Sequence, residues 1–170
     1  CVLGRIYLYE GQYEIAEHYL RRALGLNPND SDILMQIASC FVYLGYVTEA
    51  EKLYHNVLDM NPLHSGSYLH IAALIAFESG QYQKCIALGA NATTPWIDFP
   101  VIMAAAYYQQ GDLANMKKSW QSFLKDFQNK IVKGEQPDEA RALQWIINVN
   151  PYRRKTNMMP FWESIGGKKI

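Results

Sequence analysis

The stretch EGQYEIAEHYLRRALGLNPND, residues 10–30, returns 34 residues later as LGYVTEAEKLYHNVLDMNPLH, residues 44–64. Identical residues that keep this spacing include Gly11 and Gly45, Ala16 and Ala50, and Pro28 and Pro62. A fixed period of roughly 20 to 50 residues is typical of solenoids and propellers, in which each repeat is one supersecondary unit. The repeat therefore decides the architecture before any single residue does.

Within each repeat the apolar residues fall at helical spacing. Residues 32–44 contain one apolar stripe and residues 50–58 contain a second. Gly45 lies between the stripes, and glycine is the residue best suited to end a helix in the left-handed conformation. Proline cannot continue a helix, and it closes each pair of stripes as Asn27-Pro28 and Asn61-Pro62. The sequence therefore predicts a series of helical hairpins.

The composition is that of a folded chain, with 170 residues of which 49% are hydrophobic and 13% aromatic. No apolar run reaches the roughly 18 residues that a membrane span needs, and no signal peptide is recognisable. Three widely spaced cysteines, Cys1, Cys40 and Cys85, form no CxxC motif, which argues against a disulfide framework or a metal site. We therefore expect a cytoplasmic protein without membrane contact.

The net charge of zero conceals an asymmetry between the two halves of the chain. Residues 1–110 carry 5 Lys and Arg against 10 Asp and Glu, and residues 111–170 carry 11 against 6. A basic end can contact acidic protein, nucleic acid or lipid, but charge of this size is more typical of a solvated surface. We therefore do not expect nucleic acid as a partner.

These features resemble the tetratricopeptide repeat, whose pattern has Leu-Gly, a Tyr three residues later, then Ala and a closing Pro. The first hairpin matches it at Leu3, Gly4, Tyr7, Gly11, Tyr13, Ala16, Leu20, Ala23 and Pro28. The second matches it at Ile37, Ala38, Phe41, Gly45, Ala50, Tyr54, Val57 and Pro62. Two looser copies follow, with Ala72, Ala73, Gly80, Tyr82 and Cys85, and with Ala104, Tyr107, Gly111, Leu113, Trp120 and Phe123. Small residues at Gly4 and Ala38 are expected where the two helices of a hairpin approach closely.

The resemblance implies an all-α, right-handed solenoid of four helical hairpins with C-terminal capping helices. We expect the repeats at residues 1–30, 31–64, 65–95 and 96–128, and the capping helices within residues 129–170. Pro137 followed by Asp138 predicts the first turn of one capping helix, and Thr156 predicts the start of the last. Such a unit begins with about six helical residues before Leu-Gly and this chain has two, so we expect a fragment of a longer protein.

The C-terminal residues carry a second resemblance. Asn150, Pro151, Tyr152 and Arg153, with Gly166 after them, are similar to the end of bacterial signalling proteins. In those proteins tetratricopeptide repeats follow an adenylate-cyclase or winged-helix DNA-binding domain. This resemblance implies a regulatory region in bacterial signal transduction.

The concave face of such a solenoid is lined by the first helix of each hairpin, which makes it the candidate site for a protein or peptide. The predicted groove residues are Arg5, Leu8, Tyr9, Met35, Ser39, Val42, Tyr43, His70, Leu74, Phe77, Val101 and Tyr108. Tyr9, Tyr43, Phe77 and Tyr108 would form a row with one ring per repeat, a suitable anchor for an apolar segment. Alternatively these rings belong to the core, or Met159, Phe161 and Trp162 of the tail fill the groove.

Catalysis finds little support in the sequence. Its four histidines are scattered, and no metal-binding, nucleophile-elbow or phosphate-loop motif occurs. Cys40 and His70 are the one nucleophile and base on adjacent first helices, and a buried structural thiol is the commoner case. We therefore predict a scaffold that is not an enzyme and uses no cofactor or metal. Two alternatives stay open: a self-assembly module whose groove is filled by its own tail, and an effector pocket near His70 and Tyr108.

Overall fold

The computed structural model describes residues 1–63, 66–93, 96–133, 138–154 and 156–166, and in these ranges it contains ten α-helices and no β-strand. The hairpin helices are α1 (Val2–Tyr9), α2 (Tyr13–Leu26), α3 (Ser31–Leu44), α4 (Val47–Met60), α5 (Tyr68–Glu78), α6 (Tyr82–Gly89), α7 (Phe99–Gln109) and α8 (Leu113–Lys130). They are followed by α9 (Glu139–Val149) and α10 (Met159–Gly166).

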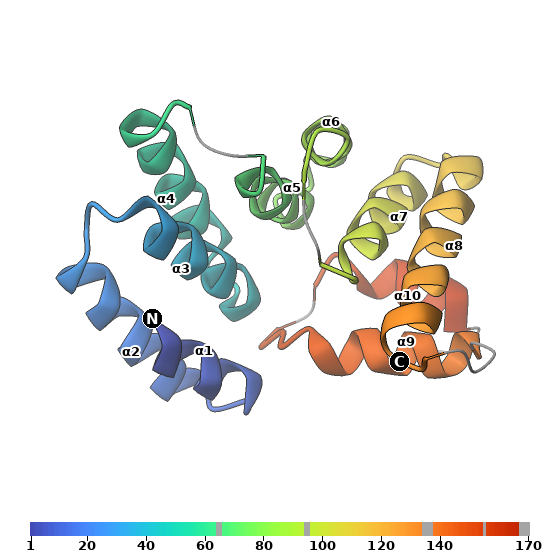
Figure 1. Ribbon diagram of the computed structural model, residues 1–170, viewed down its shortest axis with the longest axis horizontal. Coiled ribbons are helices and arrows are strands. Elements are labelled where there is room, and N and C mark those ends of the chain that lie inside the picture. Colours follow the sequence, from blue (N-terminus) through green and yellow to red (C-terminus); the bar gives the residue numbers. More distant parts are fainter. Residues whose placement is uncertain (64–65, 94–95, 134–137, 155, 167–170) are drawn as a thin grey trace.

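The helices pack in the order of the chain (Figure 1). Consecutive helices form four antiparallel hairpins, and the second helix of each hairpin packs against the first helix of the next. The first helices α3, α5 and α7 also contact one another in sequence. Because each hairpin packs against the next one in the chain, this is the α-solenoid that the repeated sequence predicts.

Glycine turns and Asn-Pro pairs set the helix ends as predicted. Gly45 follows α3 with φ of 86°, a left-handed conformation that side chains with a Cβ rarely adopt. The glycines of the other three hairpin turns, Gly11, Gly80 and Gly111, also have positive φ. The helices α2 and α4 end directly before Asn27 and Asn61. The turn chemistry that is visible in the sequence is therefore sufficient to place these boundaries.

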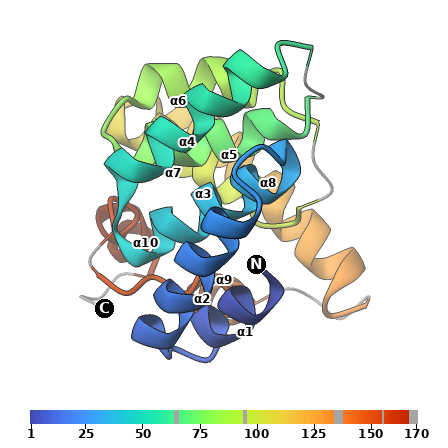
Figure 2. The ribbon, with the colours of Figure 1, turned by 90° about the vertical axis from the view of Figure 1, so that its left-hand side faces the viewer.

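First and second helices differ in how far they are buried. The first helices α5 and α7 are apolar on all sides, and residues 70–77 of α5 are all buried. The second helices, such as α2 and α4, are amphipathic and bury one stripe only. The first helices α3, α5 and α7 therefore supply most of the core, whereas α1 lies with α2 at one end of the stack (Figure 2).

Gly4 shows how closely the two helices of a hairpin approach. A Cβ added to Gly4 would lie 2.6 Å from Leu20 Cγ on α2, well inside van der Waals contact. The prediction that a small residue is needed at this position is therefore confirmed.

The C-terminal residues form two helices that cover the last hairpin. Asp138 caps α9 by accepting a hydrogen bond from Ala140 N at 2.9 Å, so the helix begins after Asp138, whereas Pro137 lies outside the described residues. The last helix begins at Met159, three residues after the predicted start at Thr156. The hydroxyl of Thr156 accepts a hydrogen bond from Met158 N at 3.2 Å and donates one to Glu78, so Thr156 begins the turn that leads into the helix. None of the helices within the described ranges is both long and apolar enough to cross a membrane.

Candidate partner-binding surfaces

The predicted groove is largely closed. Nine of the twelve predicted residues are buried, namely Leu8, Met35, Ser39, Val42, Tyr43, His70, Leu74, Phe77 and Val101. Tyr108 is partly buried, whereas Arg5 is exposed and Tyr9 is 51% exposed. A partner that approaches this face without moving any part of the chain would therefore meet only the α1 end of the predicted row.

The chain's own tail covers the middle of the row. The ring of Tyr152 lies edge-on to that of Tyr43, with 4.9 Å between the centroids. Tyr43 Oη donates a hydrogen bond to Asn150 Oδ1 at 3.1 Å, and the backbone N–H of Arg153 donates to the Tyr43 carbonyl at 2.9 Å. Burial raises the pKa of the Tyr43 and Tyr152 hydroxyls well above the usual value, so both stay protonated at neutral pH.

A charged contact fastens the tail to the first hairpin. Arg153 Nη2 lies 2.5 Å from Glu14 Oε1, and Arg153 Nη1 lies 3.7 Å from Glu17 Oε2. The guanidinium also stands 5.9 Å from the ring centroid of Tyr13, whose hydroxyl donates to the Tyr152 carbonyl at 3.3 Å. The basic end of the chain therefore contacts its acidic beginning.

Glu78, the last residue of α5, receives the rest of the tail. Its carboxylate accepts hydrogen bonds from Thr156 Oγ1 and, at 3.1 Å, from the backbone N–H of Asn157. Burial raises the pKa of Glu78, and these two hydrogen bonds oppose that shift. Gln109 Nε2, at the end of α7, donates to the Asn157 carbonyl at 3.3 Å. The tail thus reaches the third and fourth hairpins at the same end of their first helices.

The end of the row that lies at α7 is closed by α10. The ring of Tyr108 lies 5.9 Å from that of Phe161, which is fully buried and also contacts Trp120. At the other end of α7, the ring of His70 lies 4.6 Å from that of Trp96, with 48° between their planes, and it also contacts Phe99. His70 and Tyr108 therefore contact opposite ends of α7 and do not share a pocket.

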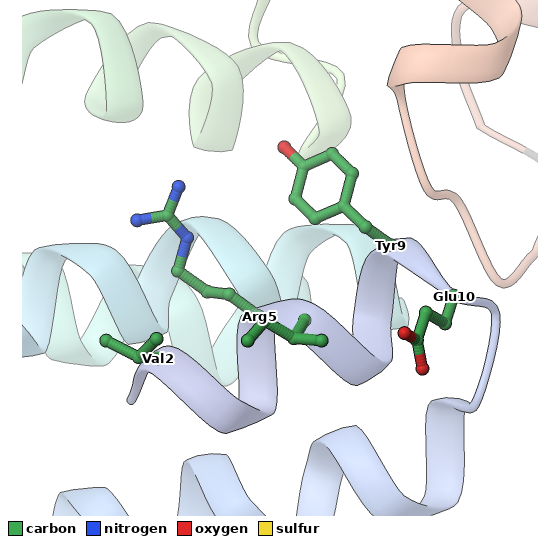
Figure 3. Close-up of a pocket in the computed structure, with 5 residues that line it drawn as sticks. Val2, Arg5, Tyr9 and Glu10 are labelled. Carbon is green, nitrogen blue, oxygen red and sulfur yellow. The ribbon is translucent and has the colours of Figure 1, made fainter.

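An open apolar surface lies on α1 instead. Val2 is 68% exposed, Leu3 51%, Ile6 47% and Tyr9 51%. A hollow of about 550 Å³ runs along this helix and is lined by Val2, Arg5, Ile6, Tyr9 and Glu10. Figure 3 shows Arg5 and Tyr9 on the same side of the helix. We call Val2, Leu3, Ile6 and Tyr9 the α1 face.

The repeat register shows that this exposure belongs to α1 alone. Three residues of the α1 face correspond, 34 residues later, to Ile37, Cys40 and Tyr43, which are 0%, 3% and 4% exposed. Cys40 and Tyr43 line a narrow recess of about 30 Å³ together with Leu8 and Tyr9 of α1. The positions that are open on α1 are therefore covered on α3, by α1, by the third repeat and by the C-terminal residues.

Cys40 and His70, the nucleophile and base singled out from the sequence, are both buried side chains. Burial raises the pKa of Cys40 to about 11, so its thiol is protonated at neutral pH. Burial lowers the pKa of His70, and both of its ring nitrogens are buried without a hydrogen-bond partner in the structure. No set of three metal-ligating side chains occurs among the residues that the structure describes.

Several residues of the tail contact were not singled out from the sequence as functional. Glu14, Glu17 and Glu78 lie 75 or more residues from their tail partners in the sequence, so no local pattern connects them. The opposite charges of the two halves of the chain are the one signal that pointed to such a contact.

Comparison with known proteins yields two kinds of match. Family models described as tetratricopeptide repeat match residues 1–54 and residues 101–129. The chain is also similar to RNA polymerase-associated protein CTR9 of Caenorhabditis elegans, with 23% identity over 182 residues and 90% of this chain covered. The chain spans about 15% of the length of that relative.

Proposed function

Since the chain belongs to the tetratricopeptide-repeat family, whose repeats are protein-interaction scaffolds, we propose that it binds a protein partner through the α1 face. The partner presents an amphipathic helix to this face. One observation carries the proposal: four large apolar side chains are about half or more exposed on a single helix of eight residues. Exposed apolar residues that cluster in this way are typical of protein interaction sites.

The register of the repeat favours a helix as the bound element. Helix α1 itself lies over Gln36, Ser39, Cys40 and Tyr43 of α3. The corresponding positions of α1 are Val2, Arg5, Ile6 and Tyr9, which line the open hollow. A partner helix with apolar residues three and four positions apart can lie on α1 as α1 lies on α3.

Arg5 and Tyr9 belong both to this face and to the groove predicted from the sequence. Arg5 Nη1 donates to Gln36 Oε1 at 3.3 Å, which holds the guanidinium at the edge of the hollow. A partner helix with a carboxylate beside its apolar stripe would pair with Arg5, and an exposed pair of this kind adds about 0.2 to 1 kcal/mol. The apolar contact therefore supplies most of the affinity, and Arg5 orients the partner.

We place this scaffold in the cytoplasm, as the non-catalytic part of a regulatory protein. The tail resembles that of bacterial signalling proteins, and the similar nematode protein is named for its association with RNA polymerase. The regulatory context rests on the tail resemblance, since the name of the nematode protein gives only its association with RNA polymerase. Bacterial origin rests on the tail resemblance alone.

The test compares two substitutions of exposed apolar residues. Ile6→Asp places a charge in the α1 face, whereas Leu63→Asp changes a loop residue that is 94% exposed and far from it in sequence. We expect a protein captured by the wild-type chain from the source cell's lysate to be lost with Ile6→Asp and kept with Leu63→Asp. The purified partner should then bind with the same preference and gain helix on binding, as measured by circular dichroism.

Equal binding of the partner to both variants would refute the α1 face as the site. Sedimentation of the wild-type chain at increasing concentration tests a second copy as the occupant. If the mass of the wild-type chain rises with concentration and that of the Ile6→Asp variant does not, the α1 face binds a second copy of the chain rather than the helix of another protein.

A further inference from the structure

A second candidate surface is already occupied in the structure, by the chain itself. Residues 150–154 and 156–158, which we call the tail segment, connect α9 to α10. In Figure 1 the chain leaves α9 toward α1 and α2 and then turns back to α10. The segment has no regular secondary structure. It contacts the repeats through Asn150, Tyr152, Arg153 and Asn157, and it contacts α10 through the ring of Tyr152, which lies 6.2 Å from that of Trp162.

The tail segment contacts the repeats as an extended ligand would. An aromatic ring, that of Tyr152, lies against Tyr43, and the adjacent backbone N–H of Arg153 bonds to the Tyr43 carbonyl. That carbonyl belongs to the last turn of α3, where helix carbonyls have no partner within the helix. The Arg153 guanidinium pairs with Glu14 and Glu17. An aromatic residue followed by a basic one is therefore the pattern that this surface accepts.

The contact is open enough to be exchanged. A cavity of about 170 Å³ lies between the tail segment and the repeats, lined in part by Val42, Tyr43, Glu78 and Tyr152. Apart from the Arg153 bond, the hydrogen bonds to the repeats involve side chains. The helices on either side are held by their own buried residues, among them Ile146 and Phe161. The tail segment can therefore leave while α9 and α10 stay folded, although Thr156 and Met158, which are buried, become exposed when it does.

We propose that the surface formed by Glu14, Glu17, Tyr43 and Glu78 is a binding site for an extended protein segment with an aromatic residue followed by a basic one. The tail segment is its intramolecular ligand, and a partner segment of the same chemistry replaces it. This site is separate from the α1 face and does not depend on it. Because a tethered ligand acts at an effective concentration in the millimolar range, a free segment competes well only when the tail contact is weakened.

The experiment uses the full chain and a fluorescent peptide of residues 149–158. Tyr152→Ala removes the ring from the tail segment and leaves the surface on the repeats unchanged. We expect this variant to bind the peptide about tenfold or more tightly than the wild-type chain does, because the tether no longer competes. A peptide with alanine at the positions of Tyr152 and Arg153 should not bind the variant.

A second variant covers the case in which Tyr152→Ala fails to fold. Arg153→Glu reverses a charge on a side chain that is partly exposed, and it should also raise peptide binding. Lys117→Ala changes an exposed basic residue on α8 and should leave binding at the wild-type level. Equal peptide binding by wild-type, Arg153→Glu and Lys117→Ala chains would overturn the proposal.

Hydrogen exchange on the wild-type chain gives an independent test. The backbone N–H groups of Arg153 and Asn157 should exchange faster than those in the middle of α3 and α5, because the tail segment opens alone. Exchange at the same rate as the core would mean that the segment opens only on global unfolding, and would overturn the proposal. Ile6→Asp should change neither peptide binding nor this exchange. The proposal for the tail-segment site and the proposal for the α1 face can therefore fail independently of each other.

Discussion

Helices α1 and α3 occupy the same position in successive repeats, yet they are buried to very different extents. Ten of the 14 residues of α3 are buried, whereas only Gly4 and Leu8 are buried among the eight of α1. Both helices are strongly apolar. The difference comes from their neighbours, because α3 lies under the first hairpin, the third hairpin and the tail segment. Burial in this solenoid is therefore a property of the stack rather than of the helix sequence.

The largest expected effect compares Phe41 with Tyr7, its counterpart 34 residues earlier. Phe41 is fully buried and contacts Tyr46, so Phe41→Ala should lower the free energy of unfolding by about 3 to 5 kcal/mol. Tyr7 is partly buried and stacks on Tyr19 with 5.5 Å between centroids. Tyr7→Ala should therefore cost less, about 1 to 2 kcal/mol.

Urea denaturation followed by circular dichroism measures both values. The slope of the transition should be similar in the two variants, so that the difference in midpoint reports stability. Equal losses would mean that α1 is as fully covered in solution as α3, by a second copy of the chain or by another segment.

A smaller effect is expected from two glycines in the first hairpin, and it tests how tightly α1 packs. In Gly4→Ala the new Cβ would meet Leu20 Cγ at 2.6 Å and the Ala16 carbonyl at 3.2 Å, so we expect a loss of about 1 to 3 kcal/mol. Gly25 lies near the end of α2 with nothing within 4 Å of such a Cβ. Gly25→Ala should therefore stabilise the chain by up to about 1 kcal/mol, through helix propensity.

The same denaturation measurement separates the two glycines, because the signs are opposite. A neutral Gly4→Ala would show that Leu20 can move aside, and that the contact between α1 and α2 is looser than the hairpin in the structure. The α1 face would then differ from α3 in its own packing as well as in its covering.

Most of the fold follows from local features of the sequence. The 34-residue period, the turn glycines and the Asn-Pro pairs act over one turn or one hairpin, and they predict α1 to α4 closely. The last helix begins three residues later than predicted, after a turn in which the hydroxyl of Thr156 accepts from Met158 N and donates to Glu78. That partner lies 78 residues away in the sequence, beyond the reach of any local pattern.

The candidate site could be predicted only in part, for the same reason. The concave positions were found from the repeat, but whether a side chain there is open depends on the path of the tail. Tyr43 and Tyr152 are more than 100 residues apart, and neither position reveals their contact. The α1 face was missed because Val2, Leu3 and Ile6 have the composition of a core helix. Only the structure shows that no described residue covers them.

The smallest expected effect is the pH dependence of stability that comes from Glu78, a residue of the tail contact. Helix α3 takes part in this contact, and α1 does not. Burial raises the pKa of Glu78 above its usual value of 4.5, so the folded state binds the proton more tightly than the unfolded state. Its contribution to stability is fully present below pH 4.5 and is lost as the pH rises through the raised value. Stability should therefore fall over this window in the wild-type chain.

Glu78→Gln removes this titration, so the difference in unfolding free energy between the two chains isolates it from all other groups. We expect that difference to change steadily from pH 4.5 upward and to level off once Glu78 is ionised in the folded state. Hydrogen exchange then locates the effect: the amides of Arg153 and Asn157 should exchange faster as the pH-corrected stability falls, and those of α1 should not. If the amides of α1 also exchange faster over this pH range, the tail segment stabilises the whole stack. Helices α1 and α3 would then differ in the exposure of their side chains and not in how the tail segment affects their stability.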